Sequence, residues 1–93
     1  MEAILSQLEQ IEAEALQALE PIQEEEVLQA WQTRYLGRSA PLAQVFNQLG
    51  GLPREARPAV GEQANRVRQH LEAVFSARRQ QLKEADLQAR LLA

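Results

Sequence analysis

The sequence predicts an all-α fold, an antiparallel two-arm coiled-coil hairpin with a short helix at its tip. Apolar residues recur every three or four positions in residues 2–19 and again in residues 59–92, which is the period of an amphipathic helix. Between these segments, residues 34–65 contain all four glycines and three of the four prolines, as turns do. We therefore expect one domain, with residues 1–36 as first arm, 37–58 as tip and 59–93 as second arm.

The first arm begins as a helix over residues 2–19, whose apolar seam is Ile4, Leu8, Ile11, Ala15 and Ala18. Glu20-Pro21 interrupts this helix, because proline lacks an amide donor and restricts the residue before it. Pro21 either kinks the arm or opens a second helix, in which the acidic residues 24–26 would lie favourably against the N-terminal dipole.

The second part of this arm presents Leu28, Trp31 and Tyr35 on one face. We expect it to end at Gly37, with that glycine as a left-handed cap.

At the tip, a short helix is predicted from Pro41 to Leu49, with Ser39 available to cap it. Its apolar positions are Leu42, Val45, Phe46 and Leu49. Because so short a helix is not stable alone, we expect it to fold across the end of the hairpin, against Leu36, Leu52 and Val60.

The second arm is one helix over residues 59–92, about 50 Å long at 1.5 Å per residue. Its stripe consists of Val60, Ala64, Val67, Leu71 and Val74, continued by Leu82, Ala85, Ala89 and Leu92. A one-sided stripe of this length predicts a partner along the whole helix, which the first arm would supply in the opposite direction.

One position of that stripe is occupied by Arg78. In an antiparallel register it falls near the Glu20-Pro21 break, and we hypothesise that it bonds Glu20, Glu24 or free carbonyls at the end of the first helix. The alternative is a snorkelling arginine whose stem packs while its head reaches water.

Charge is segregated along the chain. Residues 1–26 carry eight acidic and no basic residues, whereas residues 27–93 carry ten basic and five acidic ones, for a net charge of −3. No apolar run is long enough to span a bilayer, so no membrane is expected, and the absence of cysteine suits the cytoplasm. Catalysis is not indicated either, because the three consecutive glutamates cannot converge and spacing places no carboxylate beside His70.

The basic residues point to a different chemistry. Arg68, Arg79 and Lys83 form a ladder along the last helix, and further arginines cluster at the tip. A charged strip on a long arm can follow a phosphate backbone through counterion release and recognise a structured RNA by shape. The candidate phosphate contacts are Arg38, Arg54, Arg57, Arg68, Arg79 and Lys83.

The tip carries a specific family pattern. Tyr35-Leu36-Gly37-Arg38, an apolar spacer, Leu52-Pro53-Arg54-Glu55-Ala56-Arg57-Pro58, then Gly61 and Asn65 follow one another in order. Downstream come Ala77-Arg78-Arg79 and Leu82, and then the segment from Ala85 to Ala93. Together these elements resemble the N-terminal region of bacterial phenylalanyl-tRNA synthetase alpha subunits. The resemblance covers residues 28–93.

The resemblance implies a coiled-coil arm that embraces tRNA(Phe) and positions it for a catalytic domain further along the chain. It also implies a parent ligase of class II in the cytoplasm, with two alpha and two beta subunits, that uses ATP and Mg²⁺. This segment itself would hold no catalytic residue, cofactor or metal.

The chain departs from the family pattern after Tyr35-Leu36-Gly37, where Arg38-Ser39-Ala40 replaces two lysines and a glycine. The alternative function is a structural or oligomerising module that docks another protein. The acidic first arm favours that alternative, because it would repel RNA.

Overall fold

The computed structural model describes residues 2–92 as a slender body of 59 × 18 × 18 Å. Its elements are α1 (Glu2–Leu19), α2 (Glu25–Leu36), α3 (Pro41–Gln48), the 3-10 helix η1 (Leu49–Gly51) and α4 (Arg57–Leu92). No strand occurs within residues 2–92. The all-α class and the helical hairpin predicted from the sequence are therefore confirmed.

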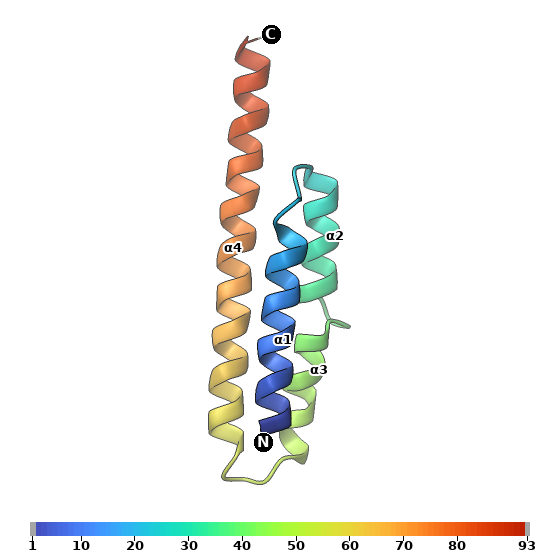
Figure 1. Cartoon of the computed structure of the whole chain (residues 1–93), viewed down its shortest axis with the longest axis vertical. Helices are drawn as coiled ribbons and strands as arrows, with labels where there is room; N and C mark the ends of the chain where they lie inside the picture. Colours follow the sequence, from blue (N-terminus) through green and yellow to red (C-terminus); the bar gives the residue numbers. More distant parts are fainter. Residues whose placement is uncertain (1, 93) are drawn as a thin grey trace.

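The hairpin consists of α2 and α3 on one side and α4 on the other, joined by the turn at the bottom of Figure 1. Tyr35 shares a surface hollow with Arg68, whereas Leu28 shares one with Arg79. Residue numbers fall on α2 as they rise on α4, so these two arms run in opposite directions (Figure 1).

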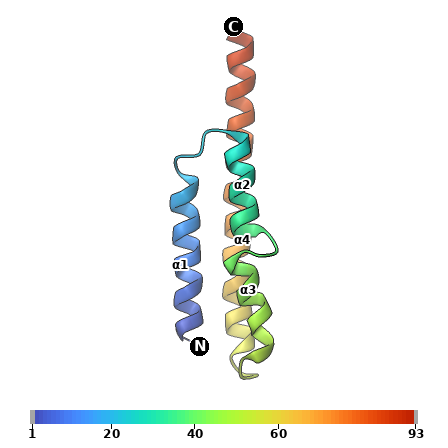
Figure 2. The same ribbon diagram turned by 90° about the vertical axis from the view of Figure 1, so that its right-hand side faces the viewer.

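In Figure 1 the chain descends through α2 and α3, and we call these two helices the descending arm. The sequence was expected to place α1 at the beginning of this arm. Instead, α1 is a third helix folded back beside it (Figures 1 and 2). The Trp31 Nε1–H donates to the carbonyl of Ala15 at 2.8 Å, which joins α2 to α1. Glu12 contacts Arg66 while Arg78 contacts Leu19, so α1 runs parallel to α4. The break at Glu20-Pro21 is thus a full reversal, and α2 starts at Glu25 rather than at Pro21.

The reversal has a physical reason in the stripe of α4. Its first half offers Val67, Leu71 and Phe75, all of them buried, whereas its second half combines leucine with alanine and has no aromatic residue. Folding back lets α1 bury its own stripe against the larger residues, which removes more apolar surface from water. The buried residues of α1 are Leu8, Ile11, Ala15 and Leu19.

The centre of the core lies at Trp31. Its indole stacks on Phe75 with ring centroids 6.2 Å apart and lies tilted against Tyr35 at 5.6 Å. Phe75, which was not expected to belong to the stripe, therefore takes the buried place expected for Val74, which is only half-buried.

The last part of α4 projects beyond the other helices (Figure 1), so the expected partner along its full length is not found among the described residues. Leu82 is half-buried at the edge of the bundle, and the side chains beyond it are exposed. The largest exposed apolar residues there are Leu87, Leu91 and Leu92.

Helix α3 continues the descending arm rather than crossing the end of the hairpin (Figure 2). It buries Leu42 and Val45 in the same core as α4. Its N-cap is Ala40 rather than Ser39, and no side chain caps the helix. The Ala40 side chain is buried. The start of α3 is therefore set by the packing of Ala40 and not by the hydroxyl of Ser39.

Gly37 ends α2 in an extended conformation, with φ of −81°, and not in the left-handed one that was expected. A glycine is still required, because a Cβ at this position would lie 2.3 Å from the Thr33 carbonyl oxygen. That oxygen accepts the hydrogen bond from the Gly37 amide, so it cannot move away without loss of the helix end.

Arg78 closes the reversal between α1 and α2, as hypothesised from the sequence. Its Nη1 donates to the carbonyls of Leu19 at 2.7 Å and Ile22 at 2.9 Å, with Glu20 at 3.4 Å. Carbonyls at the end of α1 and in the reversal thus accept from a charged donor on α4, and the Leu19 oxygen also accepts from the Ile22 amide.

Replacement of Arg78 by leucine should lower the free energy of unfolding by about 2 kcal/mol, because the half-buried carbonyls lose a charged donor. Urea unfolding followed by circular dichroism measures the change. The matched control is Arg79→Leu, whose exposed side chain should change stability by less than about 0.5 kcal/mol. An Arg78→Leu variant as stable as the parent chain would contradict this role.

Replacement of Gly37 by alanine should destabilise the chain by about 1–3 kcal/mol, because the new methyl group overlaps a backbone oxygen. Gly50→Ala is the matched control, since a Cβ there meets nothing within 4 Å. Thermal melts of the two variants should separate clearly, and equal melting temperatures would refute the steric account.

Candidate nucleic-acid interface

Three of the six predicted phosphate contacts lie on one flank of α4, the flank that faces the α2–α3 arm, and a fourth, Arg38, lies in the link between α2 and α3. Arg68, Arg79 and Lys83 are exposed and follow one another at eleven and four residues, close to whole helical turns. Arg68 lines the same hollow as Gly37, and the link that carries Arg38 bulges away from α1 in Figure 2. We call these four residues the basic flank.

Arg79 and Lys83 make no hydrogen bond or ion pair with any other residue that the structure describes. Arg68 does: its guanidinium contacts Glu72 at 3.3 Å and the Asn65 side chain at 3.2 Å. Both partners lie on the same helix and in water, so these contacts hold the guanidinium weakly. All three side chains can therefore turn toward an external anion.

The other two candidates lie at the closed end of the hairpin. Arg57 donates from Nε to the Leu52 carbonyl at 3.2 Å and from Nη2 to the Gly50 carbonyl at 3.0 Å, so it braces the turn after η1. Arg54 is exposed in the same turn. The structure therefore does not bring all six residues into one cluster.

The opposite flank of α4 is neutralised by α1. Arg66 forms an ion pair with Oε2 of Glu12 at 3.3 Å, and His70 Nδ1 lies 2.8 Å from the same oxygen. No carboxylate was expected near His70 from the sequence, and this was wrong because Glu12 comes from the folded-back helix. The sequence could have paired these residues only if the parallel alignment of α1 with α4 had been known.

This cluster changes the acidity of Glu12. The hydrogen bond from His70 is the main cause that lowers the pKa of the carboxyl, and the Arg66 guanidinium adds to the effect against the cost of partial burial. The carboxylate is therefore held ionised by two partners on α4, and the cluster joins α1 to α4.

No group of three or more histidine, cysteine or acidic side chains within residues 2–92 is placed to hold a metal ion. Over the same residues, none of the helices has the length and apolar character needed to cross a membrane.

Comparison with known proteins places the chain in a family of synthetase N-terminal domains. Residues 23–91 match the model of the class II aminoacyl-tRNA synthetase N-terminal domain, and the chain belongs to that family.

The curated relatives that it matches include alpha subunits of phenylalanine–tRNA ligase. It is 37% identical over 89 residues to the subunit from Pseudomonas fluorescens (strain SBW25), with 96% of this chain and 26% of the relative covered. It is 40% identical over 85 residues to the subunit from Heliobacterium modesticaldum (strain ATCC 51547 / Ice1), with 91% and 25% covered. The chain thus spans about a quarter of the length of these relatives. The resemblance seen in the sequence is confirmed.

The Glu12 cluster predicts how stability depends on pH. Because the pKa of Glu12 is lower in the folded chain than in the unfolded chain, its ionised form stabilises the fold above the unfolded value, and this contribution is lost as the pH falls through the folded pKa. Between about pH 5 and about pH 3, the unfolding free energy should therefore fall less steeply in Glu12→Gln than in the parent chain.

Urea titrations at several pH values measure these slopes. Glu9→Gln, which changes an exposed glutamate on the same helix, should keep the parent slope. A Glu12→Gln slope indistinguishable from that of the parent would show that the cluster does not stabilise the fold.

Proposed function

We propose that this chain is the tRNA-binding arm of a phenylalanine–tRNA ligase alpha subunit and that it positions tRNA(Phe) for aminoacylation by a catalytic domain elsewhere in the same protein. The observation that carries the proposal is the family match over residues 23–91. The exposed basic flank on an elongated rod supports it, because this surface suits a phosphate backbone.

The arm would act by position and charge. Arg68 and Lys83 are separated by about 22 Å along α4, so the basic flank can contact phosphates across a broad stretch of a folded RNA. Acidic α1 lies on the other side of α4 and repels a polyanion, which would orient the RNA toward the basic flank. The arm contributes binding free energy and takes no part in the chemical step.

The same proposal extends to the parent protein. ATP and Mg²⁺ would be bound outside the present chain, in the catalytic part, and the beta subunit would complete an assembly of two alpha and two beta subunits in the cytoplasm. The names of the curated relatives support the ligase activity and the alpha-subunit role.

A second candidate function, docking of another protein, is favoured by the projecting end of α4. Leu87 and Leu91 are 57% and 77% exposed there, one helical turn apart on one side of the helix. Sedimentation of the isolated chain distinguishes the two functions: self-association without affinity for tRNA would support docking.

The tRNA proposal is tested by removing two charges from the basic flank. The double variant Arg79→Gln/Lys83→Gln should bind tRNA(Phe) more weakly, and the slope of log affinity against log salt should fall by about one for each phosphate that is no longer neutralised. Filter binding or fluorescence titration over a series of salt concentrations measures both quantities.

The matched control is Arg34→Gln/Arg66→Gln, which removes the same charge from other faces of the bundle. It should leave the salt slope close to that of the parent chain. Equal effects of the two double variants would mean that only net charge matters, and the basic flank would then not be the interface.

A further inference from the structure

The apolar stripe of α4 continues beyond the helices that cover it. Past the reversal it consists of Leu82, Ala85, Ala89 and Leu92, on the part of α4 that projects in Figure 1. Leu82 is half-buried at the edge of the bundle, whereas the two alanines are exposed and Leu92 is 88% exposed. No other helix that the structure describes reaches this segment (Figure 1). About three helical turns of an apolar face are therefore left without a partner.

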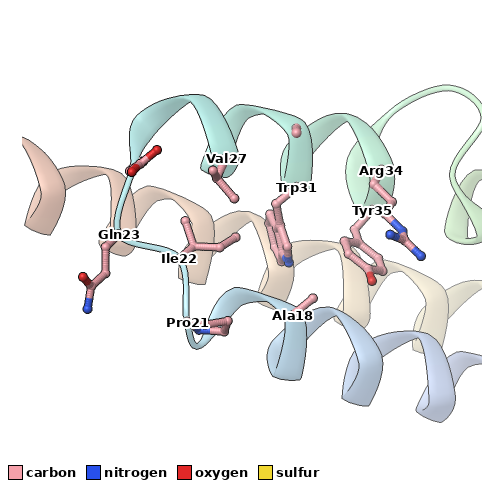
Figure 3. Close-up of a pocket in the computed structure, with 10 residues that line it drawn as sticks. Ala18, Pro21, Ile22, Gln23, Val27, Trp31, Arg34 and Tyr35 are labelled. Carbon is pink, nitrogen blue, oxygen red and sulfur yellow. The ribbon is translucent and has the colours of Figure 1, made fainter.

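The uncovered stripe begins beside a hollow. This hollow has a volume of about 500 Å³ and lies between α4 and the reversal, with Ile22, Leu82 and Ala85 as its apolar lining. Gln23 lines it from the reversal, and Figure 3 shows this side chain pointing away from the aromatic rings of α2. The hollow thus faces the projecting end of α4, and an apolar side chain of another molecule has room to enter it.

Charged residues flank this part of the stripe on one side. Lys83, Asp86 and Arg90 follow one another there at three and four residues, and Asp86 Oδ2 lies 3.1 Å from Arg90 Nη2. Gln81 and Gln88 lie on the other side of the stripe by helical spacing. Because the signs alternate along the charged side, it suits a partner with alternating charges better than a uniformly charged one.

A second copy of the same helix, running in the opposite direction, fits the apolar stripe. When Leu82 lies opposite Leu92 of the second copy, Ala85 lies opposite Ala89 of the second copy, so the two stripes match along their whole length. Leucines then meet at both ends of the contact, each of them next to one hollow. Alanines meet at the centre, where their small side chains let the two helices approach closely.

The same register also matches the charges. Asp86 lies about 3 Å along the axis from the level of Arg90 of the second copy, and the two-fold symmetry of the pair repeats this contact. A parallel copy would instead place each charge beside its own equivalent, which costs free energy. The alternating charges therefore select the antiparallel arrangement.

We propose that the projecting end of α4 is a self-association surface, on which two copies of this chain pair in antiparallel through the stripe from Leu82 to Leu92. The paired segments are about 16 Å long and bury less than the roughly 1,200 Å² of a stable complex, so the dimer is weak and forms at about 0.1–1 mM. Leu87 and Leu91 lie on the opposite side of α4 and stay exposed in this dimer. The dimer does not depend on tRNA binding, and the two are measured separately.

Sedimentation equilibrium of the full 93-residue chain between about 0.01 and 1 mM tests the association. A reversible monomer–dimer equilibrium is expected, and a chain that stays monomeric at the highest concentration would overturn the proposal. Ala89→Gln should raise the dissociation constant about tenfold, because the larger side chain separates the helices at the centre of the contact.

The matched control for this variant is Leu87→Gln/Leu91→Gln, which removes more apolar surface from the opposite side of the same segment. It should leave the dissociation constant within about twofold of the parent value. A dimer that is lost in the control and kept in Ala89→Gln would assign the contact to the wrong face of α4 and would refute the proposed stripe.

A charge exchange tests the register. Asp86→Lys should raise the dissociation constant about tenfold, because only positive charges then meet along the flank. The double variant Asp86→Lys/Arg90→Asp exchanges the two signs and restores alternation, so it should return the dissociation constant to within about threefold of the parent value. A double variant as weak as Asp86→Lys would contradict the antiparallel pairing of these residues.

The direction of the pair is tested by double electron–electron resonance on singly labelled chains at a concentration where the dimer forms. Labels at Gln88, close to the two-fold axis, should lie within about 20 Å of each other. Labels at Gln69 should be separated by about 54 Å along the axis. Short distances at both positions would show a parallel dimer and would overturn the proposal.

Discussion

The contact of Trp31 with α1 and α4 is the interaction on which the rest of the structure depends. The indole N–H donates to the Ala15 carbonyl on α1, and the ring stacks on Phe75 of α4. An indole N–H that is buried requires an acceptor, and the small side chain of Ala15 lets the helices approach closely. A single side chain of α2 thus positions α1 and α4 relative to each other. The reversal and its Arg78 bonds follow from that arrangement.

The same arrangement separates the charges. With α1 folded back along one flank of α4, its Glu12 pairs with Arg66 and His70, and the basic residues on the other flank remain exposed. The projecting end of α4 is likewise left bare because no helix of the described chain reaches it (Figure 1).

Much of the fold could be predicted from the sequence, because local periodicity determines which residues form a helix and which side of it is apolar. The buried Leu28, Trp31 and Tyr35 and the bonds of Arg78 were found in this way. The direction of α1 could not be predicted, because a 3.6-residue stripe shows that a helix has a partner but not which one. The prediction that Val74 rather than Phe75 belongs to the buried stripe was wrong for a related reason. A third helix widens the buried face of α4, so the residue next to the predicted stripe is covered as well.

The interface was predictable only in part. The ladder of Arg68, Arg79 and Lys83 lies on one helix, so helical spacing alone places it on one flank. The pairing of Glu12 with His70 depends on a contact between residues 58 positions apart, and spacing carries no signal for it. For Arg57 the error was the opposite one. The sequence suggested a guanidinium free to bind phosphate, but in the structure it donates hydrogen bonds to carbonyls of its own turn.

The reversal of α1 is the central claim, and a pair of distances between spin labels tests it most directly. Cysteine can be introduced at exposed positions because the chain has none of its own. Double electron–electron resonance should find a label at Gln10 much closer to one at Gln63 than to one at Gln88, since the latter two are about 37 Å apart along α4. A shorter Gln10–Gln88 distance would mean that α1 extends the descending arm, and the three-helix arrangement would then be wrong.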